Sequence, residues 1–224
     1  MPESFWRVEL HCHTVASPDS LAKPEAIVAA CRARRIDRLA ITEHNNIAGA
    51  LAVQRLAPDL VIVGEEIKTT KGEVIAWFVT EEVPKGLTPE ETIARLRRQG
   101  AVISIPHPLD TLRGSSAMGL ANVLTIIDQV DALEVFNARC LRPADNEAAK
   151  RLAAERGKLG TAGSDAHSAR EIGTAIMVMP PFHDAGSFRR SLALATIDGR
   201  LSGGHVRFYS QFAKRYKRLA ALFR

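Results

Sequence analysis

The sequence predicts an α/β domain whose sheet curves toward closure into a barrel. Short runs rich in Val and Ile alternate along the chain with helical patterns, which favours a largely parallel sheet. Five of the expected strands end near His, Asp or Glu, and the loops at the carboxyl ends of barrel strands converge on one site. An open doubly wound sheet is the alternative, but candidate ligand residues at so many strand ends favour a closed sheet.

Caps and breakers set the limits of the elements. Thr88 and Glu91 form a capping-box pattern around Pro89, and Gly100 closes that helix. Gly157 is the expected stop of a later helix. We expect strands at residues 5–10, 38–42, 60–68, 73–79, 101–105, 132–136, 159–162 and 174–179, and helices at residues 24–35, 47–56, 88–100, 120–129, 143–156 and 187–196.

The composition is that of one ordinary globular domain. The chain has 224 residues, of which 46% are hydrophobic and 25% charged. No apolar run approaches the length of a membrane span, and residues 1–7 lack the hydrophobic region of a signal peptide. Because Cys12, Cys31 and Cys140 show no disulfide-framework spacing, we expect free thiols in a reducing compartment and a cytoplasmic protein.

The stretch from Glu9 to His13 is the expected centre of the site. His11 and His13 follow the first strand, and alternate residues of a strand point the same way. With Asp19 they offer two imidazoles and a carboxylate, which suit a divalent transition metal. Two surface histidines are the alternative for the pair alone. We expect Cys12 to point to the opposite face.

Similar residues recur at four other strand ends. His44, the pair Glu65-Glu66, His107 and the stretch 163–167 each follow an apolar run. Scattered structural histidines would not repeat this placement. His183 and His205 lie away from these positions, so we interpret them as structural or exposed. No serine-hydrolase pattern surrounds Ser164.

The motifs taken in order resemble the PHP (polymerase and histidinol phosphatase) family of metal-dependent phosphoesterases. They are His11-x-His13, Asp19, Thr42-Glu43-His44, Gly64-Glu65-Glu66-Ile67, Pro106-His107-Pro108 and Gly163-Ser164-Asp165-Ala166-His167. Each motif is weak alone, whereas the ordered series is specific. The resemblance implies a distorted (β/α)7 barrel over residues 1–205 and two or three divalent ions (Mn, Zn or Fe).

The resemblance also implies which residues hold the ions. His11, His13, Glu66 and Asp165 would hold the first, Glu66 and His107 the second, and Asp19, His44 and His167 the third. Carboxylates among the ligands would offset the repulsion between neighbouring ions. Asp165 or His167 is the expected acid that protonates the leaving group. Arg113 and Arg139 are candidates to bind the substrate phosphate, and an arginine that faces solvent is the alternative for each.

Two departures from the family pattern bear on this assignment. Glu43 stands where the family usually has an aspartate, and no histidine lies between His107 and His167, where members often have a further ligand. Glu134, Asn137, Cys140 or a water are the alternatives for that missing ligand.

Three further glutamates, Glu65, Glu66 and Glu73, are candidate site residues. Glu65 and Glu66 point to opposite faces of their strand, and the family pattern selects Glu66 as the bridging ligand. Glu73 stands where relatives often carry a histidine. It is either an extra site residue or, as we interpret it, a surface charge of its strand.

The tail from residue 206 to residue 224 has a different character. Phe208, Phe212, Tyr216, Leu219 and Phe223 fall at helical spacing among basic residues, and much of the net charge of +5 lies here. We interpret this tail as an amphipathic helix that packs its apolar stripe on the barrel. A contact with nucleic acid or a membrane surface is the alternative.

The expected function is hydrolysis of a phosphate monoester of a small molecule, a nucleotide or a sugar phosphate, by metal-activated water. The expected partner is therefore a small anionic phosphate compound, with nucleic acid as a less favoured partner. The alternatives are a phosphodiesterase or exonuclease that cleaves oligonucleotides, a degenerate metal-binding regulatory protein, and a C–N hydrolase.

Overall fold

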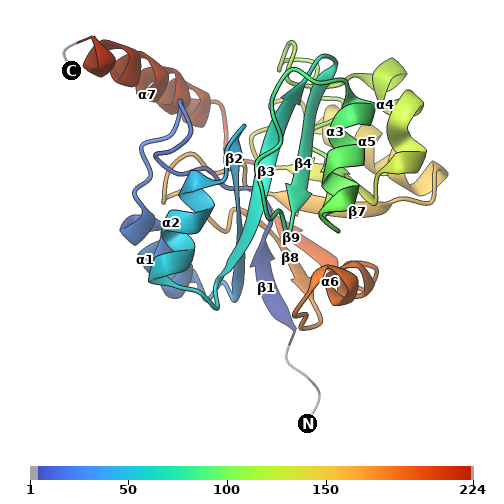
Figure 1. Cartoon of the computed structure of the whole chain (residues 1–224), viewed down its shortest axis with the longest axis horizontal. Coiled ribbons are helices and arrows are strands. Elements are labelled where there is room, and N and C mark those ends of the chain that lie inside the picture. Colours follow the sequence, from blue (N-terminus) through green and yellow to red (C-terminus); the bar gives the residue numbers. More distant parts are fainter. Residues whose placement is uncertain (1–4, 223–224) are drawn as a thin grey trace.

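The computed structural model describes residues 5–222 as one curved sheet with helices outside it (Figure 1). The strands are β1 (Trp6–Glu9), β2 (Arg38–His44), β3 (Val61–Thr69), β4 (Gly72–Trp77), β5 (Val102–Ile105), β6 (Ala132–Asn137), β7 (Leu159–Gly163), β8 (Ala175–Met179) and β9 (Thr196–Gly199). The helices are α1 (Pro24–Arg34), α2 (Ala48–Leu56), α3 (Pro89–Arg98), α4 (Leu120–Ile126) with a 3-10 turn (Ile127–Gln129), α5 (Pro143–Glu155), α6 (Ala185–Leu192) and α7 (His205–Ala221).

The sheet closes nearly into a barrel, as expected from the sequence. Its strand order is β7-β6-β5-β4-β3-β2-β1-β8-β9. The residue after β7, Ser164, links this strand to β8. Its Oγ accepts a hydrogen bond from the backbone N–H of Ala175 at 2.9 Å. Beyond the ends of β1 and β7, Cys12 and Ala166 form an isolated parallel bridge.

The expectation of a largely parallel sheet is wrong. Strand β4 runs antiparallel to β3 and β5, and β8 runs antiparallel to β1 and β9. The tight turn at Thr70 and Lys71 explains the first reversal, since a short turn joins antiparallel strands whereas parallel strands need a long crossover. Because β4 is reversed, its first residues reach the edge where β3 ends.

The barrel interior is apolar at one end and polar at the other. Along β3, Ile62 and Glu66 share the inward face, and along β4, Ile75 and Glu73 share it. The apolar end is filled by Val8, Leu10, Ile62, Ile75, Trp77, Val102, Met177, Phe182 and Phe188. This packed base supports the polar rim above it.

Helices cover the outside of the barrel in two groups. In Figure 1, α1 and α2 lie beside β2 and β3, while α3, α4 and α5 lie on the other side. The expected capping box of α3 is present, since Thr88 Oγ1 accepts from Glu91 N–H while Glu91 accepts from Thr88 N–H. Gly100 and Gly157 have φ of 74° and 59°, so both end their helices in the left-handed region.

The expected helix at residues 187–196 is misplaced. Helix α6 begins earlier, because the Asp184 side chain caps it by accepting from Ser187 N–H, and it ends at Leu192. Thr196 to Gly199 form the strand β9, which pairs with β8. The β-branched Thr196 and Ile197 suit an extended conformation.

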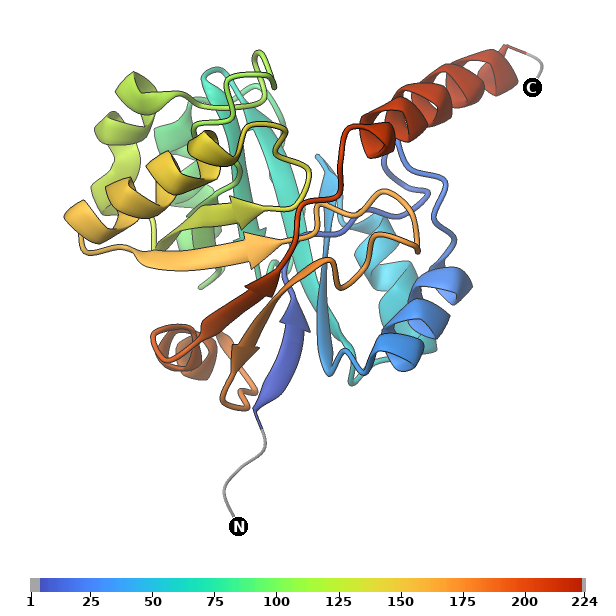
Figure 2. The same ribbon diagram turned by 180° about the vertical axis from the view of Figure 1, so that it is seen from behind.

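The expected C-terminal helix is present as α7, but its orientation differs from the expectation. Phe208, Phe212, Tyr216 and Leu219 are 54–77% exposed, so the interpretation that this stripe packs on the barrel is wrong. The helix contacts the barrel through Val206, Ser210 and Ala213, and Figure 2 shows it leading away from the sheet. Phe223 lies outside the described residues. Among residues 5–222, no helix has the length and apolar character needed to cross a membrane.

Candidate metal centre

His11 and His13 lie just beyond β1, on either side of the bridge residue Cys12. Both imidazoles are fully buried at the polar end of the barrel. Cys12 points the other way, into an apolar cluster, as expected. Gly163 permits the close packing of this region, because a Cβ at that position would lie 2.3 Å from His11 Cβ.

Two buried carboxylates face these histidines. Nε2 of His11 lies 3.4 Å from Glu66 Oε1 and 3.6 Å from Asp165 Oδ1. Nε2 of His13 lies 3.5 Å from Glu66 Oε2 and 3.4 Å from Asp165 Oδ1. Both nitrogens are buried without a hydrogen-bond partner. Ligand atoms around a tetrahedral ion at about 2.1 Å lie roughly 3.4 Å apart. His11, His13 and Glu66 form one group that could hold a divalent metal, and His11, His107 and Asp165 form another.

Glu73 brings a further carboxylate to the same edge. His107 Nε2 lies 3.0 Å from Glu66 Oε1 and 3.7 Å from Glu73 Oε2, and ligand atoms of the three residues fit one ion. Glu73 is only 6% exposed, so its interpretation as a surface charge is wrong. The sequence signal was present, since Glu73 stands at the start of a strand that follows a tight turn.

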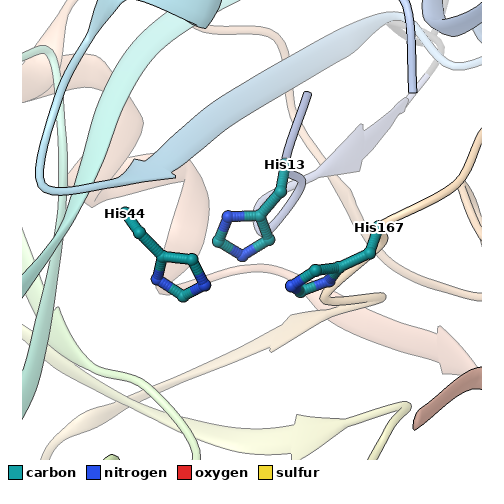
Figure 3. Close-up of side chains that lie close together, drawn as sticks. All are labelled: His13, His44 and His167. Atoms are coloured by element: carbon teal, nitrogen blue, oxygen red, sulfur yellow. The ribbon is translucent and has the colours of Figure 1, made fainter. Parts of the chain in front are cut away.

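A third group is built around Asp19. Its Oδ2 lies 3.5 Å from His44 Nε2, and its Oδ1 lies 3.4 Å from His167 Nε2. His13 stands between these two histidines, with ring centroids at 4.4 Å and 4.3 Å. Figure 3 shows the three rings converging, with His44 at the end of β2 and His13 and His167 from the segments after β1 and β7. Their ligand atoms also fit a single ion.

Hydrogen bonds on the far side of the rings orient these histidines. Ser17 Oγ bonds His13 Nδ1 at 3.2 Å and donates to Glu43. The long Glu43 side chain fits because Gly49 leaves room; a Cβ there would lie 2.0 Å from Glu43 Oε1. Such supporting bonds set the tautomer and direction of a ligand imidazole.

Glu134 and Glu9 support other parts of the site. Glu134 Oε1 bonds His11 Nδ1 at 2.9 Å, and its Oε2 accepts from His107 N–H. Glu134 therefore orients His11 and His107, and both of its carboxylate oxygens are engaged in hydrogen bonds. Glu9 accepts from the N–H groups of Ser164 and Gly173, which fixes the turn before Asp165. Burial raises the pKa of Glu9 to about 7 despite these bonds. Sequence reasoning gave Glu9 no role.

The electrostatics suit metal binding. Burial, together with His167 and His44, lowers the pKa of His13 to about 3, which leaves the neutral form that ligates metals. Burial raises the pKa of Asp165, but Arg113 and His11 outweigh it and hold the pKa well below its usual value. Burial also raises the pKa of Glu66, but His11 and His44 outweigh it and hold the pKa well below its usual value. Two ionised carboxylates therefore meet in a buried space beside Arg113 and the histidines.

The mouth of the site is a pocket of about 240 Å³ lined in part by arginines. Arg113 pairs with Asp165 Oδ2 at 2.6 Å and with Asp110 Oδ2 at 3.0 Å. Arg207, from α7, also lines the pocket and bonds Asp110; sequence reasoning treated it only as tail charge. A larger hollow of about 810 Å³ lies beside α1 and α7 and contains none of the converging histidines.

Arg139 lines the pocket but is engaged elsewhere. Its Nε donates to Glu171 at 2.7 Å, Nη1 to Ser210 Oγ at 2.8 Å and Nη2 to the Val206 carbonyl at 3.2 Å. Since it is 4% exposed, it does not face solvent. Its contacts anchor α7, and a role in phosphate binding stays a prediction.

Comparison with known proteins decides the family. The profile described as "PHP domain" matches residues 9–137, and the one described as "PHP-associated" matches residues 143–193. The chain belongs to the PHP family. An uncharacterised Methanocaldococcus jannaschii protein is 36% identical over 59% of this chain and 82% of its own length.

Two solved structures show the same fold at low identity. One is a two-domain Bacteroides vulgatus protein whose PHP-like part is described as a predicted metal-dependent phosphoesterase; it is 16% identical, with a TM-score of 0.73, over 88% of this chain and 66% of that chain. The other is a lesion-specific endonuclease of Pyrococcus furiosus, 14% identical, with a TM-score of 0.60, over 86% of this chain and 57% of that chain.

The structure of the PHP protein brings together all eight residues that the sequence analysis named as metal ligands. They are His11, His13, Asp19, His44, Glu66, His107, Asp165 and His167, and each lies within 4 Å of another member through a nitrogen–oxygen pair. Among the described residues, the groups that could hold an ion also include Glu73.

Proposed function

We propose that this PHP protein hydrolyses a phosphate monoester of a small molecule, a nucleotide or a sugar phosphate. One observation carries the proposal. The buried Nε2 atoms of His11 and His13 have no hydrogen-bond partner and converge on Asp165, which lines a pocket with Arg113 and Arg207 on its wall. Such a site combines a place for divalent ions with cations suited to phosphate oxygens.

The ions would be held in three groups. His11, His13, Glu66 and Asp165 would hold the first, Glu66, His107 and Glu73 the second, and Asp19, His44 and His167 the third, with Mn, Zn or Fe as the ions that such ligands accept. When bound, divalent ions activate water and polarise the phosphoryl group. Glu73 would add a carboxylate to the ligands of the second ion.

The pocket walls would bind the rest of the phosphoryl group. Arg113 is half-buried between Asp165 and Asp110, which raise its pKa although burial alone would lower it. It therefore keeps its charge in the pocket. We propose that it binds a non-bridging phosphate oxygen. Of the two expected acids, His167 is the one that would protonate the leaving oxygen, because Arg113 and His11 hold the pKa of Asp165 well below its usual value. A pocket of about 240 Å³ suits the compact head of a monoester.

Cleavage of a phosphodiester is the second candidate. Its support is the position of α7, since Arg207 and Gln211 of this basic helix line the pocket and could contact the neighbouring phosphates of a strand. The similarity in fold to an endonuclease is consistent with it. A degenerate regulatory protein is less favoured, because the set of candidate ligands is complete.

Phosphate release by the manganese-reconstituted protein tests the proposal. The panel holds nucleoside monophosphates, nucleoside bisphosphates, sugar phosphates, a short oligonucleotide and an amide. His11→Ala removes a candidate ligand, and His183→Ala, at an exposed position outside the site, is its matched control. Release from a monoester that only His11→Ala abolishes would support the proposal. Manganese binding with cleavage confined to the oligonucleotide or the amide would reject it.

A further inference from the structure

The outward face of α7 is the largest apolar feature that the proposed function leaves unexplained. Phe208, Phe212, Tyr216, Leu219 and Leu222 are 77%, 60%, 54%, 59% and 78% exposed. Their spacing of three or four residues places them on one face. Contiguous exposed apolar residues of this size mark an interaction site rather than ordinary surface.

The barrel holds α7 with this face turned outward. Arg139 donates to Ser210 and to the Val206 carbonyl, and Lys217 Nζ donates to the carbonyls of Val15 and Ser17 at 2.5 Å and 2.6 Å. These contacts lie on the side of the helix opposite the aromatic stripe. The stripe is therefore presented by a helix that is fixed at several points along its length.

The charge of this segment is uniform in sign. The charged residues between 200 and 224 are Arg200, Arg207, Lys214, Arg215, Lys217, Arg218 and Arg224, with no Asp or Glu among them. This surplus exceeds the net charge of +5 of the whole chain. Charge complementarity therefore requires an anionic partner.

We propose that α7 docks the protein on an anionic lipid surface, with its aromatic and leucine stripe in the headgroup region and its basic residues on the lipid phosphates. An amphipathic helix with Phe and Leu on one face and Lys and Arg beside it binds in this way. The helix lies along the surface, which agrees with the finding that it does not have the character of a membrane span.

Two other partners fit these observations less well. A helix that reads nucleic acid presents polar and basic side chains to the groove, whereas here the exposed face is Phe, Tyr and Leu. A second copy of the chain would bring two helices of the same charge together, and α7 has no acidic residue to pair with the basic ones. Lipid phosphates supply both the negative charge and the apolar layer.

Docking would place the catalytic pocket beside the lipid surface. Arg207, Ser210 and Gln211 of α7 line that pocket, and Ser210 lies on the side of the helix away from the stripe. The proposal does not rest on the proposed function, because lipid binding and phosphate release are measured separately.

Vesicle co-sedimentation of the full chain tests the proposal. The vesicles contain phosphatidylcholine alone or phosphatidylcholine mixed with phosphatidylglycerol. We expect binding only to the mixed vesicles, with loss at high salt. The combined substitutions Phe212→Ser, Tyr216→Ser and Leu219→Ser should reduce binding at least about tenfold. Lys214→Gln and Arg218→Gln should each reduce it about fivefold.

Matched variants separate this role from general effects. Leu51→Ser, Leu120→Ser and Leu194→Ser change exposed leucines elsewhere, and Lys150→Gln with Arg151→Gln changes exposed charges on α5; all should bind lipid like the original chain. Equal binding by the stripe variant, or no binding to the mixed vesicles, would overturn the proposal. So would stripe-dependent binding to an oligonucleotide, or a stripe-dependent dimer in light scattering, without lipid binding.

Discussion

At the residue scale, a hydrogen bond to Nδ1 fixes the orientation of three imidazole rings of the site. His11, His13 and His167 bond Glu134, Ser17 and the Asp165 carbonyl through Nδ1, which leaves each Nε2 directed at a carboxylate. Among residues 5–222, the polar contacts of the Glu73 side chain are with His107 and Ser116. Glu73 is therefore the ligand candidate whose role a substitution can test most directly.

The first prediction concerns Glu73. Glu73→Gln removes a charged ligand atom, and we expect manganese affinity at one site to fall roughly 10- to 100-fold. Glu73→His restores a ligand type that suits the same ions, so it should recover most of the affinity. Isothermal titration calorimetry measures both, with Glu90→Gln, at an exposed position of α3, as control. Unchanged stoichiometry and affinity in Glu73→Gln would exclude Glu73 as a ligand.

The second prediction concerns Arg113. Arg113→Gln removes the cation that contacts Asp165, and we expect kcat/KM toward the monoester to fall roughly 10- to 100-fold. The exposed Arg142 provides the control substitution Arg142→Gln, which should leave kcat/KM unchanged. Steady-state kinetics at a fixed manganese concentration measure kcat/KM. Equal kcat/KM values for Arg113→Gln and Arg142→Gln would argue against a phosphate-binding role of Arg113.

At the element scale, reversed strands and caps decide what reaches the site. The reversal of β4 carries Glu73 to the rim, and Glu65, on the opposite face of β3, accepts instead from Val83 N–H.

Away from the site, Asp131 joins three elements. It accepts from Ile103 N–H of β5 and pairs with Arg97 of α3 at 2.7 Å and Arg189 of α6 at 3.1 Å.

The third prediction uses this junction. Burial raises the pKa of Asp131, but the Ile103 N–H and the two arginines lower it overall from 3.8. The ionised form thus stabilises the fold above the unfolded-state pKa, and this stabilisation is lost as pH falls through the lower folded-state pKa. Asp131→Asn should lose about 1–2 kcal/mol at neutral pH and nothing in strong acid.

Urea unfolding at several pH values measures this difference. Asp128→Asn, three residues earlier at an exposed position, should match the original chain throughout. If Asp131→Asn loses the same free energy of unfolding at neutral pH and in strong acid, the ionised carboxylate of Asp131 is not the source of the stabilisation.

At the scale of the whole molecule, a nearly closed barrel holds a packed apolar base and a rim rich in carboxylates. Glu66, Asp165, Glu134 and Glu73 are all at most 6% exposed, and Arg113 is the cation in direct contact with Asp165. Buried charges of one sign oppose folding unless cations compensate them. Bound divalent ions would therefore stabilise the entire barrel.

The fourth prediction concerns the effect of bound metal on the thermal stability of the barrel. Manganese at about 100 times its Kd should raise the Tm of the chelator-treated protein by roughly 5–10 °C. His11→Ala should show a clearly smaller rise, and His183→Ala should show the full one. Differential scanning calorimetry gives the comparison. A Tm that does not respond to manganese, zinc or iron would contradict a metal centre at this rim.

The sequence by itself determined the family, the ordered ligand motifs and most helix limits, because these depend on residues close together in the chain. The period of a strand places His11 and His13 on one face, and a capping box marks the start of α3. Only the tertiary structure decided the strand directions, the burial of Glu73, the engagement of Arg139 by α7 and the outward turn of the aromatic stripe. Each of these depends on contacts between residues far apart in sequence, and periodicity reports that a face is apolar without reporting what covers it.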